Sequence, residues 1–435
     1  MTPRPASVLF IVAAAAGLLF AAVSTYDFVQ HLDRQLHGIH CSFIPGLGSL
    51  DASGASGCAA ALMSPYSSVL RGWIWGGLPV SLAGMAVFAF LLFRGVDLVA
   101  GRRQDSRDAT LLLVLLALLP VITSLVMGTI AIVALGELCK LCVGIYLSSF
   151  ALLGAAIWAW TGAGSGGGRD RWDEVTEPDQ EDDDEPSPAD GLVPQSLIAT
   201  VELGLFVAIP LVLYVVLAPD FSVYVGACGE LTKPDDPYGV LVPLDSNSGG
   251  VPMIEVLDPM CPACRGFERR FAASGLDERV HRQALLFPLD DECNWMVNSA
   301  LHPGACAVSA AVLCAGDHPT RVLDWAFAEQ DAIRAAAALD GGAAGRMVVE
   351  QFPDLAVCVS SNEVRSRLNR SMRWAVANQL PVMMPQVFVE GVKLCDEDTD
   401  LGLDFALSRL LDGTPVASAS APSAEVGHRR TEVSP

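Results

Sequence analysis

Two pairs of cysteines in this sequence share the spacing C-x-x-C: Cys139 with Cys142, and Cys261 with Cys264. Two cysteines three positions apart at the start of a helix lie on the same side and can close a small disulfide ring. The N-terminal end of a helix also stabilises a thiolate. Both pairs therefore have the residue type and the spacing for thiol–disulfide exchange.

The first pair also allows other interpretations from its spacing alone. Cys139 and Cys142 could form a structural disulfide, or they could be half of a zinc site to which Cys41 and Cys58 add two ligands. Twelve cysteines in all indicate an oxidising compartment, a metal, or thiol redox chemistry.

The composition indicates that much of the chain lies in a membrane. Hydrophobic residues make up 52% of the 435 residues and charged residues 17%, whereas about 25% of an average globular chain is charged. The net charge of −22 argues against a nucleic-acid partner, because binding to phosphates requires clustered Lys and Arg.

Five uncharged or nearly uncharged stretches reach the length of about 20 residues that crosses a bilayer. They cover residues 5–26, 72–93, 109–136, 141–160 and 196–219. The first could instead be a signal peptide, but its apolar run is long and "AVSTYD" is a poor cleavage site, so we expect an anchor. The fifth is the weakest prediction, because Glu202 interrupts it and Pro210 is expected to kink it.

The arginines predict the orientation of these spans. Arg94, Arg102, Arg103 and Arg107 all lie between the second and third spans, and such loops face the cytoplasm. The acidic segment after span four is then cytoplasmic as well, while all twelve cysteines lie on or near the outer face. We therefore expect a multi-pass protein of the inner (cytoplasmic) membrane, with its redox cysteines on the periplasmic, extracytoplasmic side.

The segment "CSFIPGLGSLDASGASGCAAALMSPYSSVLRGWIWGGLPVSLAG" holds an ordered series of motifs. Cys41 is followed by a Gly/Ser-rich loop, Cys58, Ser-Pro-Tyr-Ser at 64–67, and then Pro79 and Gly84. Together with the C-x-x-C pair that opens the fourth span, this order resembles the bacterial members of the vitamin K epoxide reductase family. The resemblance covers residues 7 to 160, although the gap between Cys41 and Cys58 is wider than is usual in that family.

Members of that family reduce a quinone that is held in a four-helix membrane bundle. The resemblance implies that Cys142 lies beside the quinone, which would be ubiquinone or menaquinone, and that Cys139 is its partner. Cys41 and Cys58 would form a shuttle pair on the loop. Reduction of a vitamin K epoxide is not expected, because nothing in the sequence marks an epoxide site.

The second C-x-x-C pair lies in "GVPMIEVLDPMCPACRGFERRF", which predicts a short strand, a turn and a helix that begins at the cysteines. This is the thioredoxin arrangement, in which the first cysteine, Cys261, is exposed at the helix N-terminus and Cys264 resolves mixed disulfides. Downstream, Met384-Pro385 in "QLPVMMPQVFVEGVKL" resembles the cis-proline loop of thioredoxin folds.

Long helical patterns lie between these two motifs. A helical insertion in a thioredoxin fold resembles DsbA, the periplasmic disulfide oxidant, over residues 250 to 412. The resemblance implies that Glu255 is the buried glutamate beneath the active site, where it could relay a proton. An edge-exposed position in the strand is the alternative for this residue.

The other six cysteines are expected to brace the structure. Cys293 with Cys306 is the most local pairing, and it would stabilise the fold by roughly 3 kcal/mol in the chain-entropy model. Sequence alone leaves fifteen pairings open, and His302 is expected to be a surface loop residue. The six residues are Cys228, Cys293, Cys306, Cys314, Cys358 and Cys395.

We therefore expect an α-helical membrane bundle followed by an α/β thioredoxin-like domain with a helical insertion. The expected segments are a quinone-binding four-helix domain (1–160), an acidic linker (161–194), a fifth transmembrane helix (195–219), an outer linker (220–249), a DsbA-like domain (250–413) and a disordered tail (414–435).

The expected function is a quinone-linked thiol–disulfide oxidoreductase that makes disulfides in exported thiol-containing proteins and exchanges electrons with the quinone pool of the membrane lipid. One alternative is a membrane-anchored isomerase or holdase. Another is a metal-binding protein, with zinc on the four membrane cysteines and Met260, Met383 and Met384 beside the soluble pair.

Overall fold

A computed structural model describes residues 4–35, 37–42, 50–51, 57–136, 138–163, 192–247 and 249–413. Most of the expected acidic linker (164–191) and the expected tail (414–435) lie outside these residues. The chain divides into two compact units. The first holds the residues up to Pro219 with 265–277 and 397–405, and the second holds 220–264, 278–396 and the residues from Ala406 onward.

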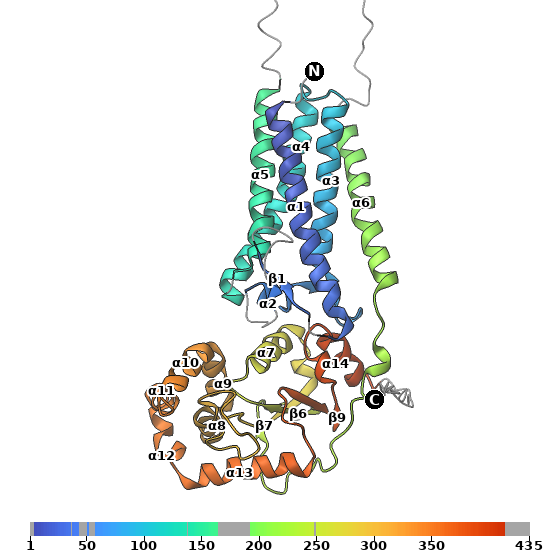
Figure 1. The fold of residues 1–435 in the computed structure, drawn as a ribbon. Coiled ribbons are helices and arrows are strands. Elements are labelled where there is room, and N and C mark those ends of the chain that lie inside the picture. Colours follow the sequence, from blue (N-terminus) through green and yellow to red (C-terminus); the bar gives the residue numbers. More distant parts are fainter. Residues whose placement is uncertain are drawn as a thin grey trace, which may run out of the picture. The chain divides into compact units, whose positions relative to one another are not determined.

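Five helices in the described residues are long and apolar enough to cross a membrane, as the sequence predicts. Helix α1 packs against α3 and α5, α4 packs against α5, and α6 packs against α3 (Figure 1). The helices are α1 (Pro5–Gln30), α3 (Val80–Ala100), α4 (Arg107–Ile130, continued by the π-helical turn η2, Ala131–Leu135), α5 (Lys140–Gly162) and α6 (Leu192–Leu217).

Glycines and serines allow the first four helices to approach closely. A Cβ at Gly17 of α1 would lie 2.2 Å from the ring of Phe88 in α3, so only glycine leaves room for that ring. Ser124 of α4 donates a hydrogen bond of 3.0 Å to Ser149 of α5. Small residues and hydroxyl groups are the usual means of helix association in membranes.

Helix α6 accommodates both Glu202 and Pro210, the two residues that made this span the weakest prediction. Glu202 accepts a hydrogen bond of 3.3 Å from Arg94 of α3, so the charge that interrupts the apolar run has a partner. The ring of Phe206 packs edge-on against Phe90, with centroids 5.7 Å apart. The helix also continues through Pro210, and a single long span results.

The segment between α1 and α3 folds as short elements. Strand β1 (Ile39–His40) pairs with β2 (Leu50–Asp51), and β3 (Ser68–Val69) pairs with β4 (Leu78–Pro79), both antiparallel. This segment also contains the short 3₁₀ turn η1 (His31–Asp33) and helix α2 (Gly57–Leu62).

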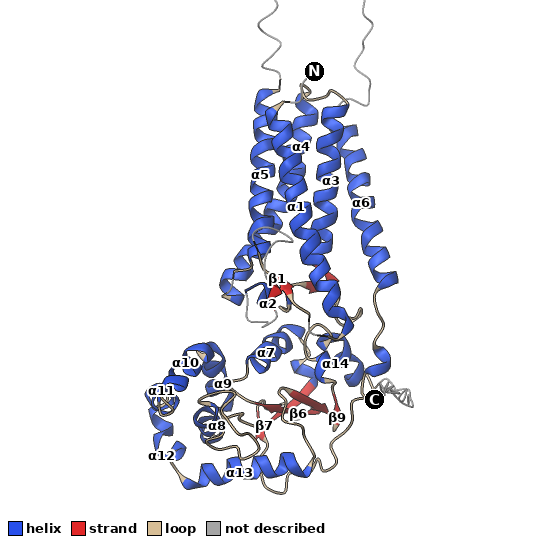
Figure 2. Ribbon diagram, in the orientation of Figure 1, coloured by secondary structure: helices blue, strands red, loops and turns tan. Residues whose placement is uncertain are grey.

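The sheet that follows in the chain has five strands in the order β5-β7-β6-β8-β9 (Figure 2). Strands β6 and β7 are parallel, and the remaining neighbours are antiparallel. Helix α7 (Pro262–Ser274) follows β6 directly, so this is the predicted thioredoxin arrangement of strand, C-x-x-C and helix. The strands are β5 (Val242–Pro243), β6 (Val251–Leu257), β7 (Val280–Leu286), β8 (Gln386–Val389) and β9 (Val392–Lys393).

Helices are inserted between β7 and β8, as expected, and α14 follows the sheet. The apolar faces of the inserted helices and the buried face of the sheet share one core, which includes Phe287, Val308 and Trp374. The helices are α8 (Ala305–Cys314), α9 (Pro319–Ala328), α10 (Gln330–Leu339), α11 (Ala343–Gln351), α12 (Ala356–Val359), α13 (Asn362–Ala377) and α14 (Leu403–Leu411), with short turns η3 (Ser222–Tyr224), η4 (Asp277–Arg279), η5 (Pro353–Leu355) and η6 (Asp396–Asp398).

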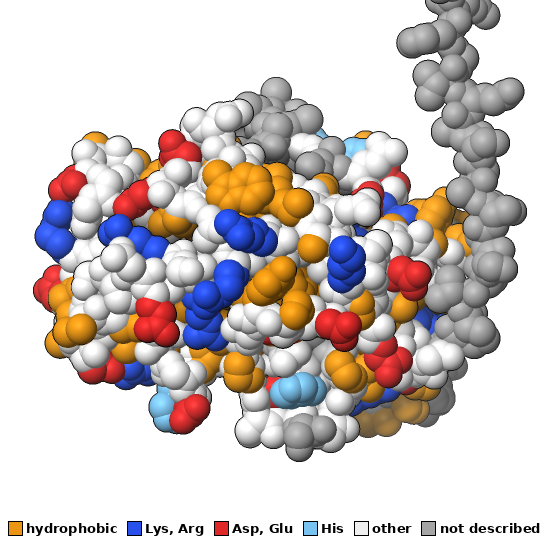
Figure 3. All heavy atoms as spheres, turned by 90° about the horizontal axis from the view of Figure 1, so that it is seen from below, with side chains coloured by type: hydrophobic (Ala, Val, Ile, Leu, Met, Phe, Trp, Pro, Cys, Tyr) orange, Lys and Arg blue, Asp and Glu red, His pale blue; other side chains and the backbone are white. Residues whose placement is uncertain are grey.

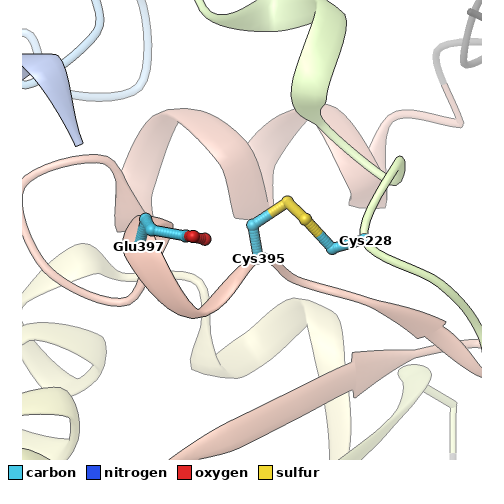
Figure 4. A group of neighbouring side chains, drawn as sticks. All are labelled: Cys228, Cys395 and Glu397. Atoms are coloured by element: carbon cyan, nitrogen blue, oxygen red, sulfur yellow. A yellow bond between two sulfur atoms is a disulfide. The ribbon is translucent and has the colours of Figure 1, made fainter. Parts of the chain in front are cut away.

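Three disulfides involve the six additional cysteines. The structure pairs Cys293 with Cys306, Cys314 with Cys358, and Cys228 with Cys395, the last of which Figure 4 shows. In the chain-entropy model the 44-residue separation of Cys314 and Cys358 corresponds to about 4 kcal/mol of stabilisation. Two of the three bonds join segments that are distant in the sequence and the third closes a local loop, which fits a bracing role.

Acidic and basic side chains lie next to one another, with hydrophobic groups between them, on the face shown in Figure 3. The negative net charge is therefore not gathered on that face. Much of it lies in residues 171–190, where the sequence carries a run of Asp and Glu.

Candidate active site

A cavity of about 330 Å³ lies within the helical bundle. Its lining is mainly apolar and comes from α1, α3, α4, α5 and the short segment between α1 and α3. Cys58, Cys139 and Cys142 all line it. The sequence motif Ser-Pro-Tyr-Ser also borders the cavity, through Ser64, Tyr66 and Ser67. One cavity thus brings together cysteines that are separated by more than 80 positions.

Cys139 is the N-cap of α5, and its Sγ accepts a hydrogen bond of 3.2 Å from the backbone N–H of Cys142. Neither cysteine is disulfide-bonded in the structure. Hydrogen bonding to the Cys142 side chain, together with the backbone N–H groups of Leu141 and Cys142, lowers the pKa of the Cys139 thiol below its ordinary value. This is the stabilisation of a thiolate expected at a helix N-terminus.

Cys41 and Cys58 are bonded to each other, with their Cα atoms 5.7 Å apart. Two of the four thiols that the zinc interpretation needs are therefore joined in a disulfide. Among the described residues, one group of three possible metal ligands lies close together, Cys228, Cys395 and Glu397 (Figure 4). Its two cysteines are also bonded to each other, so neither group offers a set of thiolates for a metal.

The second C-x-x-C pair lies where β6 leads into α7. Both Cys261 and Cys264 are free thiols, and both are buried. The peptide bond between Met384 and Pro385 is cis, as the sequence predicts. The carbonyl oxygen of Met384 lies 3.9 Å from Sγ of Cys261, so the proline loop lies against the active cysteine.

The pKa values of the two thiols of this pair shift in opposite directions. The pKa of Cys261 is lowered to about 7, mainly by hydrogen bonding to the Cys264 side chain and also by the charge of His302. Burial raises the pKa of Cys264 far above its ordinary value. These opposite shifts favour a thiolate at Cys261 and a protonated thiol at Cys264 at neutral pH.

The predicted exposure of Cys261 is wrong for this structure, in which only 5% of the residue is accessible. Several neighbours from its own unit surround it. Gln330 donates hydrogen bonds of 3.0 Å to the carbonyl oxygens of Pro259 and Cys261, and the Met384 loop packs against the sulfur. These contacts fix the turn that carries Cys261.

His302 is not the surface loop residue that the sequence suggested. Its Nδ1 lies 2.7 Å from Oδ2 of Asp258, a carboxylate with no exposed surface. Burial alone would lower the pKa of His302, but the hydrogen bond and charge of Asp258 outweigh it and raise this pKa. No local pattern indicates this pair, because 44 positions separate the two residues.

Glu255 is buried, with 1% of its surface exposed, which excludes the edge-exposed alternative. Both of its carboxylate oxygens accept hydrogen bonds from Arg282, at 2.6 and 2.9 Å. A proton relay through Glu255 would therefore have to open this pair first. Asp258 is the acid whose charge acts on both cysteines.

We predict that the reactivity of Cys261 depends on pH with a midpoint near 7 and that His302 sets part of this value. Thiolate forms as the pH rises through the pKa, so alkylation by iodoacetamide should accelerate above pH 7. In His302→Gln the positive charge is lost and the midpoint should rise by about one unit. Mass spectrometry of the alkylated Cys261 peptide measures this.

His281→Gln is the matched control, because Nδ1 of His281 is also paired with a carboxylate, Asp245, at 3.0 Å. That substitution should leave the midpoint unchanged. Equal midpoints in the parent and in His302→Gln would show that His302 does not act on the thiol.

Comparisons with known proteins support one part of the chain directly. Residues 8–157 match the Vitamin K epoxide reductase family. The comparison with curated proteins found no match.

Among the solved structures that match is "The oxidoreductase NmDsbA1 from N. meningitidis", at 15% sequence identity and a TM-score of 0.27. The match covers 42% of this chain and 89% of that one. At that score the likeness carries no structural detail, so the thioredoxin fold described above rests on the strand order, the C-x-x-C helix and the cis-proline. The chain carries a domain of the vitamin K epoxide reductase family at residues 8–157.

Proposed function

We propose that this protein is a quinone-linked thiol–disulfide oxidoreductase that forms disulfides in exported proteins. The observation that carries the proposal is the apolar cavity, which is bordered by the free pair Cys139 and Cys142 and also by Cys58 of the loop disulfide. A redox-active dithiol, a second disulfide and space for an apolar ligand thus come together in one membrane domain.

The proposed electron path begins at the thioredoxin-like domain. A substrate thiolate attacks the Cys261–Cys264 disulfide, and a second substrate thiol completes the exchange, leaving an oxidised substrate and a reduced pair. Cys261 then attacks Cys41 of the loop disulfide and releases Cys58, and Cys264 attacks Cys261, which closes their own disulfide and releases Cys41. Each exchange moves two electrons and leaves one disulfide where another is reduced.

The membrane half completes the path. The released Cys58 attacks the Cys139–Cys142 disulfide at Cys139, which frees Cys142. Cys41 then attacks Cys58, which closes the loop disulfide again and frees Cys139. Cys142 and Cys139 then close their disulfide again as two electrons and two protons pass to the quinone. Tethering the two domains raises the effective concentration of one at the other, to about the millimolar range for a short linker.

The direction of flow follows from redox potential. Protein disulfides of this type have potentials below about −100 mV, and a membrane quinone is a stronger oxidant. Electrons therefore run from dithiol to quinone, and the substrate leaves with a disulfide. Together with the arginine-rich loop between α3 and α4, this favours placing the redox cysteines on the outer face of the inner membrane.

The cavity fits a quinone in size and chemistry. Its volume of about 330 Å³ lies at the lower end of small-molecule sites, which are mostly apolar with a few polar groups. Tyr66, Ser124 and Tyr146 supply hydroxyl groups to the lining. When bound, the quinone would accept the electron pair of the membrane dithiol, and these side chains would hold its ring.

The experiment that tests the proposal uses the full chain purified in detergent. A reduced dithiol peptide and a soluble quinone are supplied, and quinone absorbance is followed. Catalytic reduction of the quinone with oxidation of the peptide would support the proposal. Oxidation of the peptide only once per chain, with no quinone reduction, would make the bundle an anchor, and metal analysis would then test for zinc.

We predict that Gly84→Leu weakens quinone binding. A Cβ at Gly84 would meet no atom within 4 Å, and the residue lines the cavity, so the leucine would occupy ligand space without disturbing the helices. The KM for quinone should rise about tenfold, corresponding to about 1.4 kcal/mol of binding free energy. Steady-state quinone reduction at varied quinone concentration measures it.

Gly154→Leu is the control for the added side chain. A Cβ at this position in α5 also meets no atom within 4 Å, but Gly154 is exposed and does not line the cavity. Its KM should match the parent. A similar rise in both variants would show that the effect is not specific to the cavity.

A further inference from the structure

A buried carboxylate lies on the wall of the cavity and is paired with a histidine. Asp27 in α1 is 2% exposed and lines the cavity with Cys139. Its Oδ1 lies 2.6 Å from Nδ1 of His40, and its Oδ2 accepts a hydrogen bond of 2.9 Å from the backbone N–H of His40. The proposed electron path gives neither residue a role.

The pair of Asp27 and His40 reaches from the wall of the cavity to a side chain that is partly exposed to solvent. His40 directly precedes Cys41 in the sequence, and 29% of its side chain is exposed. Asp27, in contrast, is closed to solvent, and its charge acts on Cys139. The two side chains thus form a short polar path from a half-exposed imidazole to the cavity wall.

Reduction of a quinone to a quinol requires two electrons and two protons. A Cys139–Cys142 pair that reacts with Cys139 as the thiolate supplies both electrons but only the proton of Cys142. The second proton must come from another donor. This requirement rests on the proposed function.

We propose that His40 and Asp27 deliver this second proton. Imidazolium of His40 passes a proton from Nδ1 to Oδ1 of Asp27, and Asp27 passes it to the reduced oxygen in the cavity. His40 then takes a proton from the outer solvent, which also receives the protons that leave the oxidised substrate thiols. Over one cycle the two electrons and two protons lost by the substrate balance those gained by the quinone.

Among the residues that the structure describes, the other ionisable groups around Asp27 do not offer an equivalent path. Nδ1 of His31, the first residue of η1, lies 2.7 Å from the backbone oxygen of Asp27 rather than from its carboxylate. Tyr26 packs edge-on against the His40 ring, with centroids 6.3 Å apart. The other titratable side chains on the cavity wall are the thiols of Cys139 and Cys142 and the phenols of Tyr66 and Tyr146.

The segment contains a matched control. Nε2 of His37 lies 2.8 Å from Oδ1 of Asp33, so it forms the same kind of pair a few residues away. Neither His37 nor Asp33 lines the cavity. A proton path to the cavity therefore depends on His40 and Asp27, whereas a general effect of charge in this segment would involve both pairs.

The test measures quinone reduction by the full chain in detergent across a range of pH. Parent turnover should fall toward alkaline pH, because only imidazolium donates. Asp27→Asn and His40→Ala should lower turnover by about a hundredfold, and His40→Ala should lose the pH-dependent fall. Added imidazole should restore turnover in His40→Ala but not in Asp27→Asn, and His37→Ala should behave as the parent.

The outcomes distinguish a proton path through Asp27 and His40 from a purely structural role of this pair. Mass spectrometry first establishes that every variant forms the Cys41–Cys58 disulfide. Turnover of His40→Ala at the parent level, or a loss that imidazole does not restore, would overturn the proton path and leave the pair a structural role. A parent protein that reduces no quinone would overturn the proposed function and this inference with it.

Discussion

Cys142→Ala should abolish catalytic quinone reduction, with a loss of about a thousandfold or more, as is usual when a reacting nucleophile is removed. Cys139 would remain at the start of α5, but without a second thiol it cannot form the disulfide that releases two electrons. The loss of the membrane disulfide can be measured by counting the substrate disulfides that each chain forms when no quinone is present. An oxidised parent chain should form three, one for each redox disulfide, and the variant should form two.

Leu147→Ala is a suitable control for this variant. It shortens another side chain of α5, five positions further on, that is 64% exposed and does not line the cavity. Turnover in that variant should remain close to the parent. Continued quinone reduction in Cys142→Ala would exclude the membrane pair as the electron donor and reduce the bundle to an anchor.

The parts of the fold that the sequence predicted correctly depend on local pattern. A membrane span requires only a long apolar run, so all five helices could be recognised, including α6. The helix after Cys261 and the cis bond before Pro385 are similarly local, since each depends on a few consecutive residues. Their positions in the structure agree with these predictions.

Errors and omissions arose where packing decides the chemistry. Asp258 and His302 are 44 positions apart, and only the folded sheet brings them to the same thiol. The sequence instead pointed to Glu255, which is buried as expected but is held by Arg282. The exposure of Cys261 was also misjudged, because residues from distant helices and loops cover it.

The pairing of the long-range disulfides could not be predicted from the sequence for the same reason. Cys228 and Cys395 are 167 positions apart, and no pattern in either segment indicates the other. The cavity could be expected only from the family resemblance, because its lining comes from four helices and a loop. The pairing of Asp27 with His40 likewise depends on how the segment after α1 folds back.

A second large effect is expected from Cys261→Ser, which should stop oxidation of a peptide dithiol while leaving quinone reduction by dithiothreitol within about threefold of the parent. Dithiothreitol is small enough to reduce the Cys41–Cys58 disulfide directly, so it bypasses the thioredoxin-like domain. A peptide needs the Cys261–Cys264 disulfide, and serine cannot form it. Measuring quinone absorbance with each reductant separates the two entry points, and loss of both activities would contradict the order of the path.

Cys264→Ser provides the complementary result, because the two thiols have opposite pKa shifts. When the variant is given the disulfide dimer of a one-cysteine peptide, the thiolate of Cys261, with a pKa of about 7, attacks one sulfur and the other peptide leaves as a thiol. No resolving thiol then remains to release the bound peptide. The variant should therefore accumulate the substrate adduct on Cys261, visible as a mass shift that reductant removes. An adduct in Cys264→Ser but not in Cys261→Ser would identify Cys261 as the residue that meets the substrate, because the buried, protonated thiol of Cys264 reacts only after the first bond has formed.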